Sequence, residues 1–419
     1  MSLGLRPIAR SLRTIAQAAR YGRPTGEVST EEYVRQYPDR WRPVVKRELP
    51  KRVPPRQYGP EATGFEHLET IPELGLLTVP NGLVTSPHGW VYTSGGRLLS
   101  DCAWPYRSAG PKILPKVFAK AKRVRGRCLN IVSDWSTTNY GHFTIDSLTR
   151  YRLFTMSGMA GDAIDYIYAP KPDSELTLRL MKQLGIPIEK CIWAQDEARI
   201  RADVIIAPSF PSSRYNHPRW MVDFLRTAKP ATAKGGKRIY VPRGNSRNIS
   251  NQAEILAILN DFDFEIYDCT KYAGFEYFGD AEIVVGAQGA GLTNVVYCKP
   301  GTTLLELIPS DHSYPFFYTL ADSGDLDYNF IMGRSAQHRP FGSGVSPFDF
   351  WIDTDVFRMA LEELIAKQGR RSARSDSNSN LLDKFEHHAG DLGLRSLRAA
   401  GDTPQQPTAA DVGDPAGQC

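Results

Sequence analysis

The stretch from residue 282 to residue 309, EIVVGAQGAGLTNVVYCKPGTTLLELIP, constrains the fold of this chain more than any other part. It predicts a buried strand over 282–287, a glycine-rich turn over 288–291, a short helix over 292–298 and a second buried strand over 303–308. Short apolar runs rich in Val, Ile and Leu are typical of parallel strands that are covered on both faces. We therefore expect an α/β domain built on a parallel sheet.

The glycines of this stretch, Gly286, Gly289 and Gly291, let the backbone turn sharply and let a ligand approach its N–H groups. A helix that begins here points unpaired amides and the positive end of its dipole at the turn, which suits an anion such as a diphosphate. Glycine-rich turns also occur in folds that bind nothing at this position. On spacing alone, a purely structural turn is an equally good interpretation.

A chain of 419 residues exceeds what one hydrophobic core usually holds, so we expect two domains. Alternating strand and helix patterns in both halves favour two Rossmann-like domains with parallel sheets and covering helices. The expected division is a basic arm and irregular connector at 1–60, a first domain at 61–228, a flexible linker at 229–236, a second domain at 237–345, a closing helix at 346–368 and a largely disordered tail at 369–419.

Strands and helices are expected to alternate within each domain. In the first domain the predicted strands are 76–79, 89–93, 128–133, 165–169, 191–194 and 203–207, and the predicted helices are 140–156, 175–184 and 218–228. In the second domain, apart from the stretch 282–309, the predicted strands are 238–241, 265–267 and 328–332. The predicted helices are 253–260, 272–278 and 354–367.

Positive charge is concentrated near the N-terminus. Residues 1–60 hold 13 Lys and Arg against 5 Asp and Glu, so the remainder of the chain carries a slight negative balance. This distribution argues against nucleic-acid binding by the folded body. Residues 7–19 have apolar side chains at helical spacing with arginines on other faces, which predicts a basic amphipathic helix on an anionic membrane surface; a solvated or docked helix and a mitochondrial presequence remain alternatives.

The six cysteines are scattered without the spacing of a metal site, which fits a reducing, cytoplasmic environment. No run approaches the roughly 18 apolar residues that span a bilayer. We therefore expect a cytoplasmic protein, bound at most peripherally to the inner face of a membrane.

Two polar motifs follow predicted strands at their carboxyl ends, where ligands bind in α/β sheets. Arg243 and Arg247 lie in the loop after the strand 238–241, and guanidinium groups pair well with phosphate oxygens. His142 and Asp146 are four residues apart near the start of a helix, so they share one of its faces. The alternatives are a solvated basic loop and a His–Asp pair that only braces its helix.

The chain resembles glycosyltransferase family 61 over roughly residues 75–335. Three blocks carry this resemblance. They are Asn139-x-x-His142-x-x-x-Asp146, then Arg238-Ile-Tyr-Val-Pro-Arg243 with Arg247, Asn251 and Glu254, and finally Gly286-Ala-Gln-Gly-Ala-Gly-Leu-Thr-Asn294 followed by Leu304-Leu-Glu306-Leu. The family usually has His where this chain has Gln288, and glutamine cannot become a cation or act as a titrating acid.

The resemblance implies a GT-B-like architecture, in which two Rossmann-like domains face each other across a cleft, and an inverting, metal-independent transfer from a nucleotide-sugar. Such a displacement needs a base, for which Asp146 is the first candidate and His142 the second. The acceptor-side residue is Asn139, and the expected donor-side residues are Arg243, Arg247, Gln288, Gly289, Ala290, Gly291, Asn294 and Glu306, the last as a ligand of the ribose hydroxyls.

No metal or other cofactor is expected. Asp325-Leu-Asp327 has the spacing of a metal-binding motif, but it lies in a loop before a late strand. The expected partners are a nucleotide-sugar donor and a glycan or lipid-linked glycan acceptor, in bacterial capsular or surface polysaccharide biosynthesis. The alternatives are a polysaccharide pyruvyl transferase and a non-catalytic protein that binds nucleotide-sugars or glycans.

Overall fold

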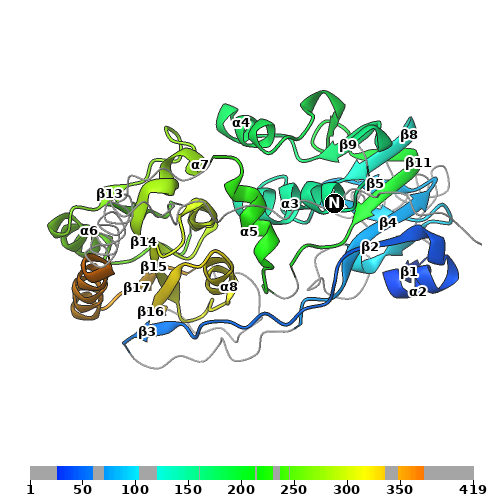
Figure 1. Ribbon diagram of the computed structural model, residues 1–419. Helices are drawn as coiled ribbons and strands as arrows, with labels where there is room; N and C mark the ends of the chain where they lie inside the picture. Colours follow the sequence, from blue (N-terminus) through cyan, green and yellow to red (C-terminus); the bar gives the residue numbers. More distant parts are fainter. Residues whose placement is uncertain are drawn as a thin grey trace, which may run out of the picture. The chain divides into compact units, whose positions relative to one another are not determined.

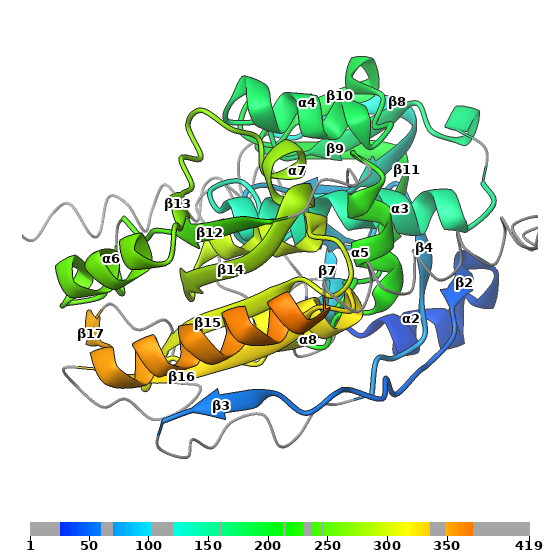
Figure 2. The ribbon, with the colours of Figure 1, turned by 60° about the vertical axis from the view of Figure 1, so that its left-hand side comes forward.

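Two β-sheets carry the described part of the chain (Figure 1, Figure 2). This computed structural model describes residues 26–59, 70–102, 120–159, 161–212, 215–229, 236–244, 246–335 and 348–371. The expected N-terminal amphipathic helix, most of the expected linker at 229–236 and the tail beyond 371 lie outside these residues. The described residues up to 361 belong to one compact unit, and residues 362–371 belong to a second one.

The first sheet has ten strands in the order β1-β7-β6-β5-β11-β8-β9-β10, and β4 pairs with both β11 and β2. Strands β8 to β11 are joined by parallel pairings, whereas β11 is antiparallel to β4 and β5. The sheet is therefore mixed, with a parallel half and a half in which every pairing but that of β1 with β7 is antiparallel. Its strands are β1 (Gly26–Val28), β2 (Trp41–Val45), β4 (Leu74–Pro80), β5 (Leu83–Thr85), β6 (Trp90–Tyr92), β7 (Arg97–Leu99), β8 (Lys122–Asn130), β9 (Tyr166–Ala169), β10 (Cys191–Trp193) and β11 (Arg199–Pro208).

The second sheet has seven strands in the order β13-β12-β14-β15-β16-β17, and β3 pairs with β16. All pairings are parallel except that of β16 with β17. The parallel sheet predicted from the stretch 282–309 is confirmed. The strands are β3 (Arg56–Tyr58), β12 (Lys237–Val241), β13 (Glu265–Ile266), β14 (Ala281–Ala287), β15 (Thr303–Pro309), β16 (Asp327–Ser335) and β17 (Phe350–Trp351).

Helices connect these strands, and residues 354–371 are helical as well, as predicted for this region. None of the helices in the described ranges combines the length and apolar character needed to cross a bilayer. They are α2 (Thr30–Gln36), α3 (Thr149–Met156), α4 (Glu175–Gln183), α5 (Arg219–Arg226), α6 (Gln252–Asp261), α7 (Gly274–Tyr277) and α8 (Phe316–Ser323), with η1 (Pro38–Arg40), η2 (Ser100–Cys102), η5 (Gly161–Ala163), η6 (Ile188–Lys190), η7 (Phe278–Asp280) and η8 (Ala290–Tyr297) in 3₁₀ form and η4 (His142–Leu148) in π form.

The Pro- and Arg-rich segment before residue 60 is more ordered than the sequence predicts. Instead of an irregular connector, it forms the strands β1 and β2 of the first sheet, the helix α2 between them, and the strand β3 of the second sheet. These strands have three to five residues each, too few to show an alternating pattern. Their pairing partners β4, β7 and β16 lie far along the chain, so the pairing has no local signal.

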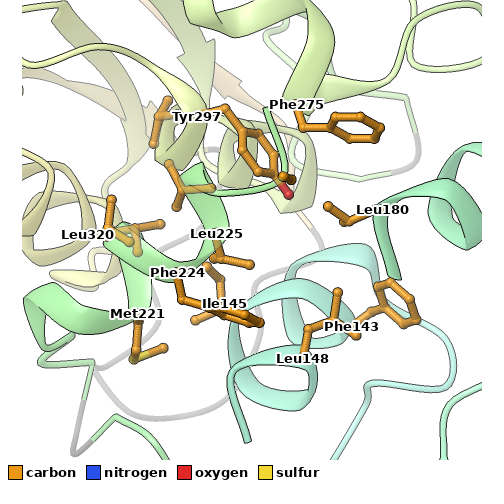
Figure 3. Packing of buried hydrophobic residues seen from close by; sticks show 14 of the residues in the cluster. Phe143, Ile145, Leu148, Leu180, Met221, Phe224, Leu225, Phe275, Tyr297 and Leu320 are labelled. Carbon is orange, nitrogen blue, oxygen red and sulfur yellow. The ribbon is translucent and has the colours of Figure 1, made fainter. Parts of the chain in front are cut away.

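One apolar cluster extends from the first sheet to the second. Its contacts run from β4 and β11 through α3 and α5 to η8 and α8. Figure 3 shows its side chains from η4, α5 and η8, among them Ile145, Leu148, Phe224, Leu225 and Tyr297. Both sheets therefore pack on one shared core, in which η4 contacts η8.

Arg52 fastens the N-terminal segment to two distant parts of the chain. Its guanidinium donates to the Asp322 carboxylate at 2.9 Å and the Ser323 hydroxyl at 2.7 Å, and to the Asn216 side-chain oxygen at 2.7 Å. The side chain is only 7% exposed. A buried guanidinium with several acceptors stabilises a fold mainly because its removal leaves those acceptors unpaired.

We predict that Arg52→Ala lowers the free energy of unfolding by about 3–5 kcal/mol, because it leaves the nearly buried Asp322 carboxylate without its cation. Arg52→Lys should give an intermediate loss, since an ammonium group keeps the charge but not the fork that reaches both segments. Urea denaturation measures the effect, with the exposed Arg47→Ala as control. Equal stability of the Arg52→Ala and Arg47→Ala proteins would contradict this role.

Candidate active site

Three loops come together at the carboxyl edge of the second sheet. Strands β12, β14 and β15 are parallel neighbours. The loops that follow them, at 242–247, 288–291 and 310–314, therefore leave the same edge of the sheet. This edge is where α/β sheets bind their ligands.

Arg243 lies against the glycine turn. A Cβ atom on Gly289 would fall 1.5 Å from the Arg243 Nη1 atom, so only glycine allows this approach. The Arg243 Nε group donates to the Ser246 carbonyl, which orients the guanidinium. Arg243 and the glycine turn, which the sequence assigns to the same site, are thus direct neighbours in the structure.

Arg247 is the second cation of this loop. It is 9% exposed and adopts a left-handed backbone conformation with φ +56°, which is strained for a residue with a side chain. Asp311 and Tyr314 are its electrostatic neighbours from the loop after β15. Burial lowers the pKa of Arg247, and it lowers the pKa of Arg243 to about 10 with a further contribution from the Arg247 charge. Two like charges are therefore held close together in partly desolvated surroundings.

Gln288 and Glu306 lie behind this turn rather than on its surface. Glu306 is fully buried in β15 and accepts a hydrogen bond from the Tyr328 hydroxyl at 2.6 Å. Gln288 is 5% exposed, its amide nitrogen donates to the Tyr314 carbonyl at 3.5 Å, and its proximity acts to lower the pKa of Glu306. The Glu306 carboxyl thus lies inside the sheet layer, whereas the sequence predicts it at the end of a strand beside a ribose.

Asn294 links the glycine turn to the first sheet. Its amide donates to the Gly291 carbonyl at 2.9 Å, and its oxygen accepts from the Tyr140 hydroxyl at 2.7 Å. A Cβ atom on Gly141 would lie 3.0 Å from the Thr293 hydroxyl and 3.7 Å from the Ala290 Cα atom. Asn294 therefore braces the glycine turn, in addition to the donor-side role that the sequence predicts for it. The head of the helix that carries His142 therefore lies against the start of η8.

The helix that carries His142 and Asp146 begins in π form, where the sequence predicts an ordinary α-helix. Asn139 caps it, since its side-chain oxygen accepts from the Gly141 amide at 2.9 Å and the His142 amide at 3.3 Å. Its side chain thus serves the helix start, whereas an acceptor contact was expected from the sequence. Short π-helical segments often mark functional sites, because they re-aim side chains within a helix.

His142 and Asp146 form the pair that the sequence predicts. The His142 Nδ1 atom lies 2.6 Å from Asp146 Oδ2, and the side chains are 23% and 0% exposed, respectively. Burial raises the pKa of Asp146, while the hydrogen bond from His142 and the nearby Arg150 charge act in the opposite direction. The carboxyl is thus hidden behind the imidazole, and only the imidazole reaches the surface.

Arg150 supports this pair from beneath and was not predicted as part of the site. It is 1% exposed, and its guanidinium donates to the Val132 carbonyl at 2.6 Å and the Cys102 carbonyl at 2.8 Å. Its charge acts on both Asp134 and Asp146. The sequence shows only an arginine four residues after Asp146 in the same helix. Helical amphipathicity alone would place such a residue on the solvent face.

Asp325 does not point at the candidate site. It forms a two-bonded ion pair with Arg219, with 2.8 Å between Nη1 and Oδ1, and Asp327 accepts from the Thr303 hydroxyl at 3.3 Å. Within the described ranges, no group of three or more His, Cys, Asp and Glu side chains is arranged to hold a metal ion.

We predict that Glu306 makes stability depend on pH. Burial raises its pKa from 4.5 to about 8, so between these values the folded state binds one proton more than the unfolded state. The contribution of Glu306 to the free energy of unfolding is fully present below pH 4.5. It is lost as the pH rises to 8, at roughly 1.4 kcal/mol per pH unit. Glu306→Gln should remove that slope in urea titrations at pH 5 to 8, whereas the exposed Glu175→Gln should keep it. An unchanged slope in Glu306→Gln would show that Glu306 is ionised in the folded protein.

Comparisons with known proteins point to one family. The model of the family described as Glycosyltransferase 61 matches residues 140–305, which span η4 and the glycine turn. A curated beta-1,2-xylosyltransferase of Arabidopsis thaliana is 40% identical over 61 residues, a stretch that covers 15% of this chain and 11% of that protein. The region that is similar to glycosyltransferase family 61 thus contains the His–Asp helix, the Arg243–Arg247 loop and the glycine turn.

Proposed function

We propose that the protein is a glycosyltransferase that moves a sugar from a nucleotide-sugar donor to a hydroxyl group of a glycan acceptor. The observation that carries this proposal is the Arg243 guanidinium beside Gly289, with the Arg247 charge acting on it from the same loop. A bound anion is stabilised by each guanidinium group. Burial and the repulsion between the two positive charges make anion binding here more favourable. A diphosphate at this position is complementary to both.

The turn before η8 adds backbone donors to the same place. The amides of Gly289, Ala290 and Gly291 lie at the start of a helical segment, where N–H groups have no partner within the helix. Preorganised donors of this kind stabilise the negative charge that develops on a departing diphosphate. In the proposed mechanism, these amides and the two arginines stabilise the leaving group, and no metal ion takes part.

His142 is the base in this proposal, with Asp146 as its positioning residue. From the sequence, Asp146 is the first candidate, but its 0% exposure and 2.6 Å contact with His142 favour the opposite assignment. The imidazole takes the proton of the acceptor hydroxyl at Nε2, and the buried carboxylate stabilises the imidazolium that forms.

The reaction then balances as one displacement. The acceptor oxygen forms a bond to the anomeric carbon as the bond to the diphosphate oxygen breaks, and the diphosphate leaves with that electron pair. Attack opposite the leaving group inverts the anomeric configuration. The closeness of Gly141 to Ala290 and Thr293 supports this path, because it brings the head of the His142 helix next to the glycine turn.

The donor and the biological setting are further parts of the proposal. The likeness to a beta-1,2-xylosyltransferase makes a pentosyl donor the first to test, ahead of hexosyl donors. We retain a role in bacterial surface polysaccharide assembly at the cytoplasmic face of a membrane. Its proposed membrane anchor, the basic helix within residues 1–24, is tested by cell fractionation after deletion of those residues.

A polysaccharide pyruvyl transferase is the second candidate, because two arginines also suit the phosphate of phosphoenolpyruvate. A thermal stability screen separates the two, since a ligand that binds only the folded state raises the melting temperature. Stabilisation by nucleoside diphosphates supports a glycosyltransferase, and stabilisation by phosphoenolpyruvate alone supports the alternative. Transfer or hydrolysis of any donor in a nucleotide-sugar panel would exclude a purely binding protein.

We predict that Arg243→Ala abolishes the melting-temperature increase caused by UDP or GDP and reduces transfer by about 100-fold or more, because it removes charge from the leaving-group site. Arg238→Ala is the matched control, since Arg238 lies at the amino end of the same strand and donates to the Phe262 carbonyl. It should keep the nucleotide effect. Equal nucleotide stabilisation of both variants would place the diphosphate elsewhere.

We predict that Asp146→Asn lowers kcat by about 10²- to 10⁴-fold and leaves the affinity for the nucleotide unchanged. An asparagine can hold the imidazole in the wrong tautomer and cannot stabilise an imidazolium. Steady-state kinetics together with calorimetric titration of the nucleoside diphosphate measure the two effects. Wild-type turnover in this variant would remove Asp146 from the mechanism.

A further inference from the structure

Trp135 is an exposed aromatic residue beside the proposed base. Its side chain is 46% exposed, one of few large apolar side chains with such exposure in the described part of the chain. The centre of its ring lies 5.2 Å from that of His142, with 38° between the planes. A half-exposed indole beside the proposed base has an aromatic face within reach of a ligand that contacts this base.

The backbone holds Trp135 in an unfavourable conformation. Its φ of +60° is left-handed, which costs free energy for any residue with a Cβ atom. The Trp135 carbonyl accepts from the Thr138 and Asn139 amides, so the turn leads directly into the cap of η4. Strain of this kind persists where the surroundings enforce it, and it clusters at ligand sites.

Both neighbours of Trp135 are anchored. Asp134 lies 2.9 Å from the His88 Nδ1 atom and accepts from the Trp90 indole at 3.3 Å. Ser136 accepts from the Ser133 amide at 3.1 Å and donates to the Ser133 carbonyl at 2.8 Å. The loop is therefore braced on either side of an indole that itself remains half-exposed, as in a preorganised binding site.

We infer that Trp135 is the platform on which the acceptor sugar stacks. This inference rests on the proposed function. A pyranose ring has one face of C–H groups, and that face is complementary to the electron-rich face of an indole. A sugar on Trp135 lies next to His142, so one of its hydroxyl groups can reach the base.

The position of Trp135 assigns it to the acceptor rather than to the donor. The diphosphate is proposed to bind the loops after β12 and β14 of the second sheet, whereas Trp135 follows β8 of the first sheet. The base must contact the acceptor hydroxyl. An aromatic ring packed beside the base therefore contacts the sugar that bears this hydroxyl.

Saturation-transfer NMR tests this inference with the methyl pyranosides of xylose, glucose, galactose and mannose as probes, in the presence of UDP. The full-length wild-type protein should transfer saturation to the ring protons of at least one pyranoside, and Trp135→Ala should weaken that binding roughly tenfold. Trp135→Phe should retain part of it. Ile266→Ala removes a 57% exposed apolar side chain from the second sheet and should leave the signal unchanged.

Trp135→Gly separates a binding role from a structural one. Glycine tolerates the left-handed φ, so this variant should keep or raise the melting temperature while losing pyranoside binding. A lower melting temperature with intact pyranoside binding would show that the indole serves the fold. No pyranoside signal in the wild type, or equal signals in wild type and Trp135→Ala, overturns the inference. If UDP and GDP also fail to stabilise the wild type, the proposed function fails; if they do stabilise it, only the Trp135 assignment fails.

Discussion

The contact between the head of η4 and the start of η8 is the constraint on which the site depends. Gly141 has no side chain, and this lets the helix approach Ala290 and Thr293 while the Tyr140 hydroxyl bonds Asn294. The shared apolar cluster beneath, drawn in part in Figure 3, holds both elements in place. Without this contact, the His–Asp pair and the glycine turn would be two unrelated features on two sheets.

Burial of charged groups is the second organising feature. Asp146, Arg150 and Glu306 are almost completely buried, and each has hydrogen-bond partners. Arg243 and Arg247 differ, because their charges repel each other. Asp311 lies near Arg247 and offsets part of its charge, while burial lowers the pKa values of both guanidinium groups.

The sequence predicts the second sheet well and the first only in part. The runs that form β14 and β15 are continuous and apolar, and their predicted bounds differ from the observed ones by one residue. In contrast, β1, β2 and β3 have no pattern of their own and depend on partners from β4, β7 and β16. Tertiary pairing of this kind cannot be inferred from short polar segments.

The candidate site divides in the same way. Spacing predicts that His142 and Asp146 meet, because residues four apart share a helix face, and the structure brings them together. It does not predict which of the two is exposed, since the turn to π form changes the directions of their side chains. Glu306 was placed at a strand end because a buried acid is costly, and the structure instead keeps it buried beside Tyr328 with a raised pKa. The left-handed backbone of Trp135 has no signature in the sequence.

The most direct test of the central claim is a crystal structure of the protein with bound UDP or GDP. The account predicts diphosphate oxygens about 3 Å from the Arg243 guanidinium and the amides of residues 289–291, with the His142 imidazole facing the same space. A diphosphate bound at another edge of either sheet, away from His142, would contradict it.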